Sequence, residues 1–131
     1  DKNNYRRFRI KSVQGIDDYK MLAEVLRRRY SRIIKEGGVL PDLLLIDGGK
    51  GHLLTAAKQL KELHLSIPLV SIAKKDEHIY SSCKSRPLKF IEDTPALNLI
   101  RRVRDEAHRF ALAYHHLLRK KELVKCMLSK E

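Results

Sequence analysis

A single carboxylate followed by several glycines is the first feature of the sequence that could support chemistry. In LLLIDGGKGHL, residues 43–53, an apolar run ends at Asp47, and three glycines and Lys50 follow at once. Ligands of open α/β sheets bind beyond the carboxyl ends of the strands, and glycines let the backbone turn sharply and come close to a ligand. A helix that begins there favours anions. The stretch therefore predicts a site for a phosphate group, a metal ion, or both.

Two other interpretations compete with this one. A nucleotide-binding P-loop has Ser or Thr after its lysine, whereas Gly51 follows Lys50 here, and the dinucleotide pattern GxGxxG is absent. In the simpler alternative, Asp47 only caps the turn and the helix that follow. The short motif alone does not decide between a capping residue and a functional one.

A histidine among arginines is the second candidate for chemistry. His108 lies in RRVRDEAHRFALAYHH beside the apolar face of a predicted helix, with Arg101 and Arg104 on nearly the same side. Nearby positive charges disfavour the charged imidazole, so a neutral ring that accepts a proton or binds a metal is one interpretation. A histidine that simply lies at the helix edge or in contact with the core is the other. The weaker candidates are His52, His64, His78, His115 and His116.

The charge balance favours a polyanionic partner. The chain has 131 residues, with 28 Lys and Arg against 16 Asp and Glu, which gives a formal net charge of +12. Nucleic acid is favoured because each neutralised phosphate releases condensed counterions. A basic surface that only keeps the protein soluble is the alternative. Clustering supports nucleic acid, and the clusters lie at residues 6–11, 27–29, 74–75, 101–104 and 119–121.

Composition argues against several classes of protein. The sequence has no run of 18 apolar residues, so no membrane-spanning helix is expected. Its first residues, DKNNYRRFRIK, contain no apolar signal segment, so we expect a cytoplasmic protein. Cys83 and Cys126 have no metal-ligand spacing and are expected to be reduced thiols. A content of 43% apolar residues is enough for the core of one domain.

Hydrophobic periodicity predicts the elements that position these residues. Asp17 or Asp18 can cap a first helix, Gly37 can end it, and Pro95 after Asp93 or Thr94 can begin a long last helix. The order predicts an α/β domain with a partly parallel sheet. The remaining residues after about 121 either continue the last helix or fray. The expected elements are a strand at residues 5–13, a helix at 19–36, a strand covered on both faces at 42–46, a helix at 52–65, a buried strand at 67–73, a hairpin at 78–91 and a helix from 95 to about 121.

Several blocks together resemble one protein family. YRRFRIK, LPDLLLIDGGKGHL, SIAKKDEHIY and TPALNLIRRVRDEAHRFALAYHH stand in the order found in UvrC, the endonuclease of the bacterial excinuclease ABC system. The resemblance covers roughly residues 5–121, and blocks in register are far more specific than one motif. It implies the C-terminal nuclease region of that family, an RNase H-like mixed sheet flanked by helices.

The resemblance also implies a function. In the family this region is a DNA endonuclease of nucleotide excision repair, a cytoplasmic system of the DNA-damage and SOS response, and it makes the metal-dependent incision 5′ to a lesion. Its active site is an Asp, Asp, His set with a divalent metal, Mg²⁺ or Mn²⁺. The second family Asp matches Asp47, and the family His matches His108, each as catalytic residue and metal ligand. The implied partners are damaged double-stranded DNA and, in the full-length protein, the UvrB protein of the excinuclease with DNA.

Basic residues would then hold the DNA backbone. Contacts to phosphates supply affinity rather than sequence readout, which suits an enzyme that must cut wherever damage lies. The expected DNA-binding residues are Lys50, Lys74, Lys75, Arg101, Arg104 and Arg109.

The main departure from the family concerns its first catalytic Asp, which lies on an opening strand upstream of the YRRF block. Asp1 is not assigned that role, and residues 1–131 are expected to form one partial RNase H-like domain without its first strands. One carboxylate and one histidine should bind a divalent metal poorly, so the isolated chain is expected to be weak or inactive unless Glu77, Asp105 or Glu106 replaces the missing carboxylate. A catalytically incomplete DNA-binding fragment is therefore the alternative function. A basic RNA-associated structural protein would leave the DGGKG and RDEAHRF blocks unexplained.

Overall fold

The computed structural model describes residues 1–73, 78–84, 86–89 and 94–128. The chain divides into two compact units. One consists of Phe8–Lys89 and is called the sheet unit below. The other combines Asp1–Arg7 with Phe90–Glu131 and is called the long-helix unit. Each is described by itself, and the expectation of one domain over the whole chain stays a prediction.

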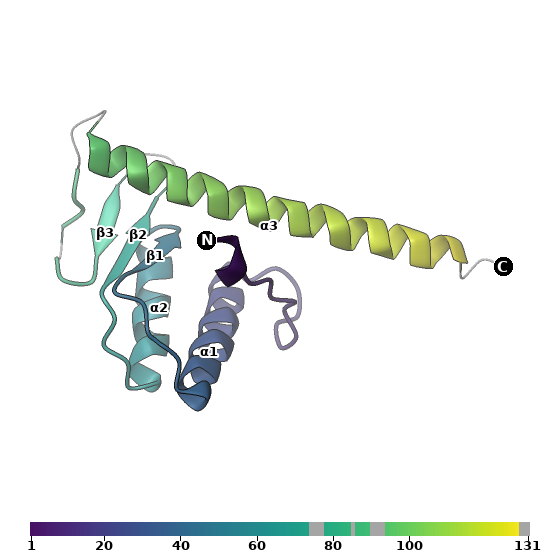
Figure 1. Cartoon of the computed structure of the whole chain (residues 1–131), viewed down its shortest axis with the longest axis horizontal. Helices are drawn as coiled ribbons and strands as arrows, with labels where there is room; N and C mark the ends of the chain where they lie inside the picture. Colours follow the sequence, from purple (N-terminus) through teal and green to yellow (C-terminus); the bar gives the residue numbers. More distant parts are fainter. Residues whose placement is uncertain (74–77, 85, 90–93, 129–131) are drawn as a thin grey trace. The chain divides into compact units, whose positions relative to one another are not determined.

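The sheet unit contains a mixed sheet of three strands (Figure 1). The strand order is β1-β2-β3, with β1 parallel to β2 and β2 antiparallel to β3. Two helices alternate with the first two strands, so the predicted α/β fold with a partly parallel sheet is confirmed. In chain order the elements are α1 (Asp18–Glu36), β1 (Leu44–Asp47), α2 (Lys50–Glu62), β2 (Leu69–Ile72) and β3 (Ile79–Ser81).

Both ends of α1 form as predicted. The Asp17 carboxylate accepts a hydrogen bond from the Lys20 backbone N–H at 3.0 Å, so Asp17 rather than Asp18 is the cap. At the other end Gly37 adopts a left-handed conformation with φ of 63°, which glycine allows at little cost. Its N–H group donates to the carbonyl oxygens of Ile33 and Ile34.

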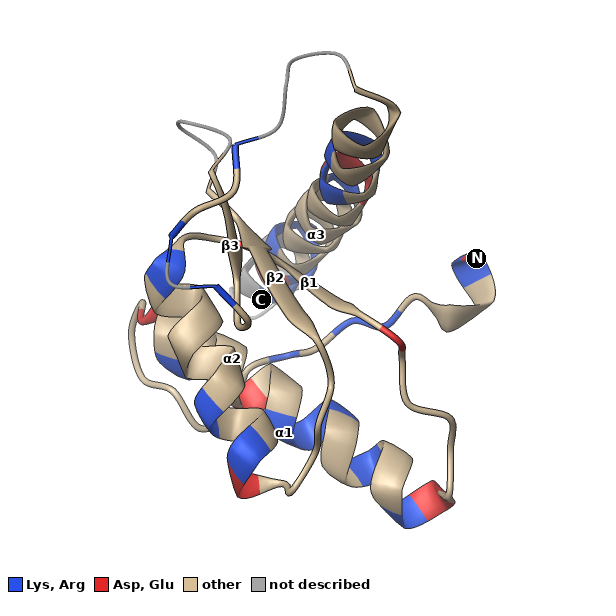
Figure 2. Cartoon of the chain, turned by 90° about the vertical axis from the view of Figure 1, so that its left-hand side faces the viewer, with Lys and Arg blue, Asp and Glu red and all other residues tan. Residues whose placement is uncertain are grey.

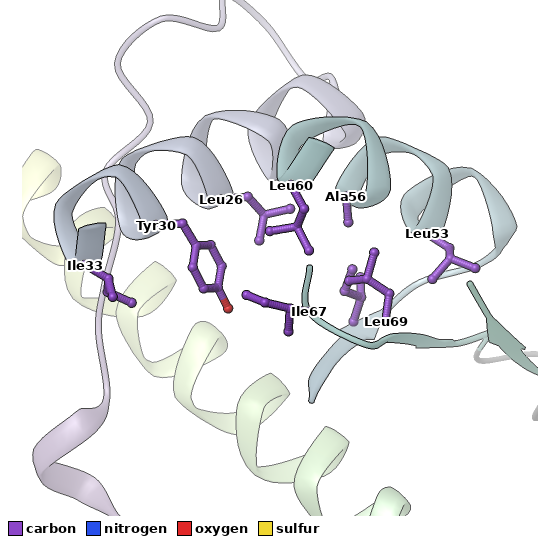
Figure 3. Close-up of a cluster of buried hydrophobic side chains, with 9 residues drawn as sticks. Leu26, Tyr30, Ile33, Leu53, Ala56, Leu60, Ile67 and Leu69 are labelled. Carbon is purple, nitrogen blue, oxygen red and sulfur yellow. The ribbon is translucent and has the colours of Figure 1, made fainter. Parts of the chain in front are cut away.

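The core lies between the two helices and the sheet (Figure 3). Side chains on one face of α1 point toward side chains of α2, and residues of β2 and of the segment before it close the cluster. The apolar positions recur at helical spacing on α1 and α2, which is why both helices bury one face. The buried residues of this cluster are Leu26, Tyr30, Ile33, Ile46, Leu53, Ala56, Leu60, Ile67 and Leu69.

The prediction of a strand at residues 5–13 is wrong. These residues are not in a strand or helix, and a buried carboxylate binds part of their backbone. Glu24, which is only 3% exposed, accepts hydrogen bonds from the backbone N–H groups of Lys11 and Ser12 at 2.9 and 3.0 Å. Because these N–H groups bind a side chain, they are not available to pair with a neighbouring strand.

Two other strand predictions are met only in part. In β1 only Ile46 is buried and Leu43 before it is 52% exposed, so the expected cover on both faces of residues 42–46 is wrong for the part of the chain described. The hairpin is reduced to β3 and one antiparallel bridge between Ile79 and Leu88. Residues 85, 90 and 91 of that predicted hairpin lie outside the described residues.

The long-helix unit consists mainly of α3 (Pro95–Leu128). It also contains a short 3₁₀ helix near the start of the chain (η1, Lys2–Asn4). As predicted, Pro95 is the first residue of α3, and the Thr94 hydroxyl accepts a hydrogen bond from the Leu97 N–H at 3.4 Å. The helix runs past Lys121, so the residues up to Leu128 continue it. Charged residues recur along α3, and none of the helices in the described ranges has the length and hydropathy needed to cross a membrane.

Candidate functional site

Asp47 lies where the sequence predicts it, at the carboxyl end of a strand. It is the last residue of β1, and its side chain is exposed. In the parallel pairing of β1 with β2, Asp47 stands opposite Ile72, so both strands end at the same edge of the sheet. Ligands of parallel sheets bind at that edge.

The segment after Asp47 is connected to β2 by two hydrogen bonds. The Gly48 N–H donates to the carbonyl oxygen of Ile72 at 2.9 Å. The hydroxyl of Ser71, which is fully buried, donates to the carbonyl oxygen of Gly49 at 3.3 Å. The sequence pattern does not single out Ser71, because one serine in an apolar run gives no periodic signal. These contacts hold the turn between β1 and α2 against the sheet.

The simpler interpretation, in which Asp47 caps the helix after this turn, is wrong. Gly49 is the N-cap of α2, and no side chain forms a capping hydrogen bond there, so Asp47 does not cap the helix. The glycines with positive φ in the described residues are Gly15 and Gly37, so neither Gly48 nor Gly49 has a left-handed backbone. Gly48 and Gly51 instead lie against rings, since a Cβ atom at Gly48 would be 2.4 Å from Cγ of His52.

The start of α2 has the electrostatics of an anion site. Lys50 is the first residue of the helix and is exposed, and the first turn contains no acidic residue. The free N–H groups of a helix N-terminus and its dipole favour negative charge. Lys and Arg also occur on α1 and α3 (Figure 2), so positive charge is not restricted to this end of α2. The exposed Asp47 carboxylate therefore lies only three residues before Lys50, at a helix start that is suited to a phosphate.

His108 lies on α3, in the long-helix unit, and its side chain is exposed. Of the two simple alternatives, a histidine in contact with the core is therefore not supported, and a histidine at the helix edge stays open. Arg101 and Arg104 precede it on the same helix and are half-buried. Arg104 donates to the Asp105 carboxylate at 3.2 Å, and Arg101 donates to the side-chain oxygen of Asn98 at 3.4 Å. The imidazole is therefore accessible from the solvent.

The carboxylate of Glu106, two residues before His108 in the sequence, already accepts hydrogen bonds on both oxygen atoms. Glu106 accepts two hydrogen bonds from the Arg109 guanidinium, at 2.7 and 2.6 Å, and a third from the Tyr5 hydroxyl at 3.0 Å. Arg109 and then Tyr5 lower the pKa of Glu106 to about 2, and the bond to Glu106 raises the pKa of Tyr5. Glu106 is therefore ionised at neutral pH, but its oxygen atoms already have partners.

The same contacts tie the start of the chain to α3. The Tyr5 ring meets the Phe110 ring edge to face, with centroids 4.9 Å apart. The Arg7 guanidinium lies over the rings of Phe110 and Tyr114, at 4.7 and 5.5 Å from their centroids, close enough for cation–π attraction. The sequence pattern does not reveal this cluster, because the alternation of basic and aromatic residues in YRRFRIK is also typical of a strand.

Some of the other predicted site residues already form ion pairs, and some lie outside the described residues. Arg109 is paired with Glu106, so a role in binding phosphate would require it to exchange that partner. Of the three carboxylates considered as replacements for the missing family Asp, Asp105 is paired with Arg104 and Glu106 with Arg109. The third, Glu77, lies outside the described residues, as do Lys74 and Lys75.

Asp47 and His108 fit a divalent cation only in part. They belong to different units, and each unit is described by itself. In the described parts of the chain, no three His, Cys, Asp or Glu side chains form a group that could hold a metal ion. Mg²⁺ prefers six ligands, mostly oxygen atoms. An exposed carboxylate at a strand end has suitable chemistry, but the described residues do not complete a site.

Comparison with known proteins gives a consistent result. The model of the UvrC RNase H endonuclease domain family matches residues 1–112. UvrABC system protein C of Methanococcus maripaludis is 54% identical over 125 residues, which is 95% of this chain and 24% of that protein. The homologue of Methanosarcina mazei is 50% identical over 124 residues, again 95% of this chain and 24% of the relative. The one from Chlorobium chlorochromatii is 49% identical over 118 residues, 90% of this chain and 19% of its own length.

The chain thus spans about a quarter of the length of the relatives that it matches first. The match covers β1, the turn with Asp47, and the part of α3 that contains His108. The mixed α/β sheet is also the kind of fold expected for such a domain. This chain belongs to the UvrC RNase H endonuclease domain family.

Proposed function

We propose that this chain contributes the nuclease domain of an excision-repair endonuclease that binds damaged double-stranded DNA and cuts it 5′ to the lesion. The observation that carries the proposal is the position of Asp47. It is an exposed carboxylate at the carboxyl end of β1, directly before an anion-favouring helix start, in a family of endonuclease domains. The DNA backbone is a polyanion, and the chain carries a net charge of +12.

The roles of the residues follow from their chemistry. Asp47 and His108 would be metal ligands, with proton transfer as the alternative role of the His108 imidazole. A bound Mg²⁺ or Mn²⁺ would supply an activated water and stabilise charge on the scissile phosphate. Lys50 and the N–H groups at the start of α2 would hold a DNA phosphate beside Asp47. Further ligands are required, because the described residues do not complete a metal site.

The UvrABC names of the relatives extend the proposal to partners. A system of three proteins implies that the full-length protein acts together with UvrB on DNA. Damage recognition would then lie with the other proteins of the system. The contacts of this chain with phosphates would supply affinity for any DNA sequence.

Plasmid nicking in the presence of Mn²⁺ tests the function. We expect the wild-type chain to convert supercoiled plasmid to the open-circular form slowly, and we expect Asp47→Asn and His108→Ala to abolish this activity. Asp42→Asn is the matched control, since Asp42 is exposed in the same unit and has no assigned role. Nicking that persists undiminished in Asp47→Asn would contradict the proposal.

A second function is favoured by the absence of a complete metal site from the described residues. In this alternative the chain holds DNA through its basic residues and cannot cut on its own. The same samples distinguish the two functions in a gel-shift assay. Binding without any nicking supports the alternative, and a chain that neither binds nor nicks contradicts both.

A further inference from the structure

The glycines of the turn after Asp47 make room for two aromatic rings. A Cβ atom on Gly48 would lie 2.4 Å from Cγ and 2.6 Å from Nδ1 of His52, far inside van der Waals contact. Gly48 has no positive φ, so backbone conformation does not require glycine there. Glycine is required because the His52 ring occupies the space that a Cβ atom would need.

Gly51 repeats this arrangement with a ring from another element. A Cβ atom on Gly51 would lie 2.6 Å from the hydroxyl oxygen of Tyr19 and 2.9 Å from two of its ring carbons. Tyr19 comes from the first turn of α1, whereas Gly51 is the second residue of α2. Glycine is unfavourable inside a helix compared with alanine. Contact with Tyr19 gives a physical reason for glycine at this position.

The two rings also contact each other. The centroids of Tyr19 and His52 are 4.7 Å apart, with a tilt of 47° between the ring planes. Such a distance is typical of attractive ring pairs. The pair therefore links α1 to the first turn of α2, on the side of the turn where Gly48 and Gly51 present bare backbone.

From β2, two hydrogen bonds hold the same turn. The Ile72 carbonyl oxygen accepts from the Gly48 N–H, and the buried Ser71 hydroxyl donates to the Gly49 carbonyl oxygen. Gly49 itself has no heavy atom within 4 Å of an added Cβ. The backbone next to Asp47 is thus fixed by hydrogen bonds from the sheet and by packing against the ring pair.

We infer that Tyr19, His52 and Ser71 are positioning residues, which hold the Asp47–Gly51 turn rigid so that the Asp47 carboxylate and the Lys50 end of α2 keep a constant relative position. This deepens the proposed function and rests on it for its catalytic meaning. None of the three residues needs to touch DNA or metal. Their effect is transmitted through the backbone of Gly48 and Gly49.

Backbone order measured by ¹⁵N relaxation in the full chain tests the inference. Rigid backbone has order parameters of about 0.85, and flexible backbone falls below about 0.6. We expect His52→Ala to lower the order parameters of Asp47, Gly48 and Gly49 clearly. His52→Phe retains a ring and should keep them close to the wild-type values. If His52 only stabilised the fold, His52→Ala would lower the unfolding temperature without lowering the order parameters of Asp47, Gly48 and Gly49.

A double-mutant cycle separates space filling from positioning. We expect Gly48→Ala to lower the unfolding temperature because of the clash with His52, and we expect the double variant Gly48→Ala, His52→Ala to recover it. The order parameters at Asp47 should stay low in the double variant, since the ring is still missing. Gly49→Ala is the matched control, because its Cβ meets no atom and its φ of −89° suits alanine.

The inference is overturned if His52→Ala leaves the order parameters of the turn at wild-type values, or if Gly48→Ala unfolds at the wild-type temperature. Neither measurement uses DNA cleavage, so the outcome is separate from that of the nicking assay. A turn that loosens in His52→Ala while Asp47→Asn still nicks plasmid would leave the positioning inference standing and remove the proposed catalytic role.

Discussion

Glu24 shows how one buried carboxylate can replace regular secondary structure. Its oxygen atoms accept hydrogen bonds from the hydroxyl and backbone N–H of Ser12, from the N–H of Lys11, and from the Arg28 guanidinium. Arg28 also donates to the carbonyl oxygen of Arg9 at 2.8 Å. A strand-like sequence is thereby fastened to α1 by a side chain. The hydrogen bonds from Ser12, followed by those from Lys11 and Arg28, lower the pKa of Glu24 from its ordinary value of 4.5 to about 2.

This pKa predicts how the stability of the chain depends on pH. A carboxyl group with a lower pKa in the folded state stabilises the fold above its ordinary pKa, and that contribution is lost as the pH falls from about 4.5 to about 2. We expect Glu24→Gln to lower the unfolding temperature by several degrees at pH 7 and to have little effect near pH 2. Thermal unfolding followed by circular dichroism at several pH values measures this.

The control is Glu36→Gln, which removes an exposed partner of Arg32 on the same helix. Exposed ion pairs contribute little to stability, so this variant should unfold near the wild-type temperature. If the deficit of Glu24→Gln were equally large at pH 7 and pH 2, the hydrogen-bonded carboxylate would not be its cause.

The helix α2 carries the packing that positions the turn after Asp47. Leu60 is only 2% exposed and lies in the core, whereas Leu54 on the same helix is 61% exposed. Truncation of a buried leucine to alanine removes contacts and leaves a cavity, which costs about 2–5 kcal/mol of unfolding free energy. Urea unfolding should show this loss for Leu60→Ala and a change within about 0.5 kcal/mol for Leu54→Ala. Equal losses for the two variants would contradict the core assignment.

The sequence predicts elements well where local chemistry decides them. The Asp17 cap, the left-handed Gly37 and the Pro95 start of α3 all act within one helical turn, and each forms as expected. Residues 5–13 fail because their backbone partner is Glu24, whose position depends on tertiary packing. Hydrophobic periodicity also cannot show which face of β1 is buried by other elements.

The candidate site follows the same rule. Asp47 at the end of a strand was predictable, since an apolar run and glycines mark that position. The contacts of Gly48 with His52 and of Gly51 with Tyr19 were not, because they join residues by shape rather than by a motif. The pairing of Arg109 with Glu106 was equally hidden, since spacing along a helix does not show which charges pair.

At the scale of the whole molecule, the net charge of +12 predicts how the proposed affinity for DNA depends on salt. We expect the affinity for duplex DNA to fall steeply with salt, because bound phosphates release counterions. A protein that contacts about 6 phosphates loses about 10³-fold in affinity between about 50 and 200 mM salt. Fluorescence anisotropy with two duplexes of unrelated sequence measures both the salt slope and the sequence preference.

The two duplexes should give the same affinity at each salt concentration, since phosphate contacts do not read bases. An affinity that stays constant over this range of salt would show that charge does not drive the binding. Lys50→Ala should reduce the slope by about 1 if Lys50 contacts one phosphate.

The order of elements in the sheet unit has a consequence for the way in which the chain reaches its native state. β1 pairs in parallel with β2 across the whole of α2, with Leu44 opposite Leu69, and residues of α1 pack against α2 and β2, so the contacts that form this core join segments far apart along the chain. Loop closure must precede such contacts, and parallel pairing is for this reason slow to form. We therefore expect the sheet unit to fold slowly for its size, with α2 and the central strand β2 carrying the slowest amide hydrogen exchange.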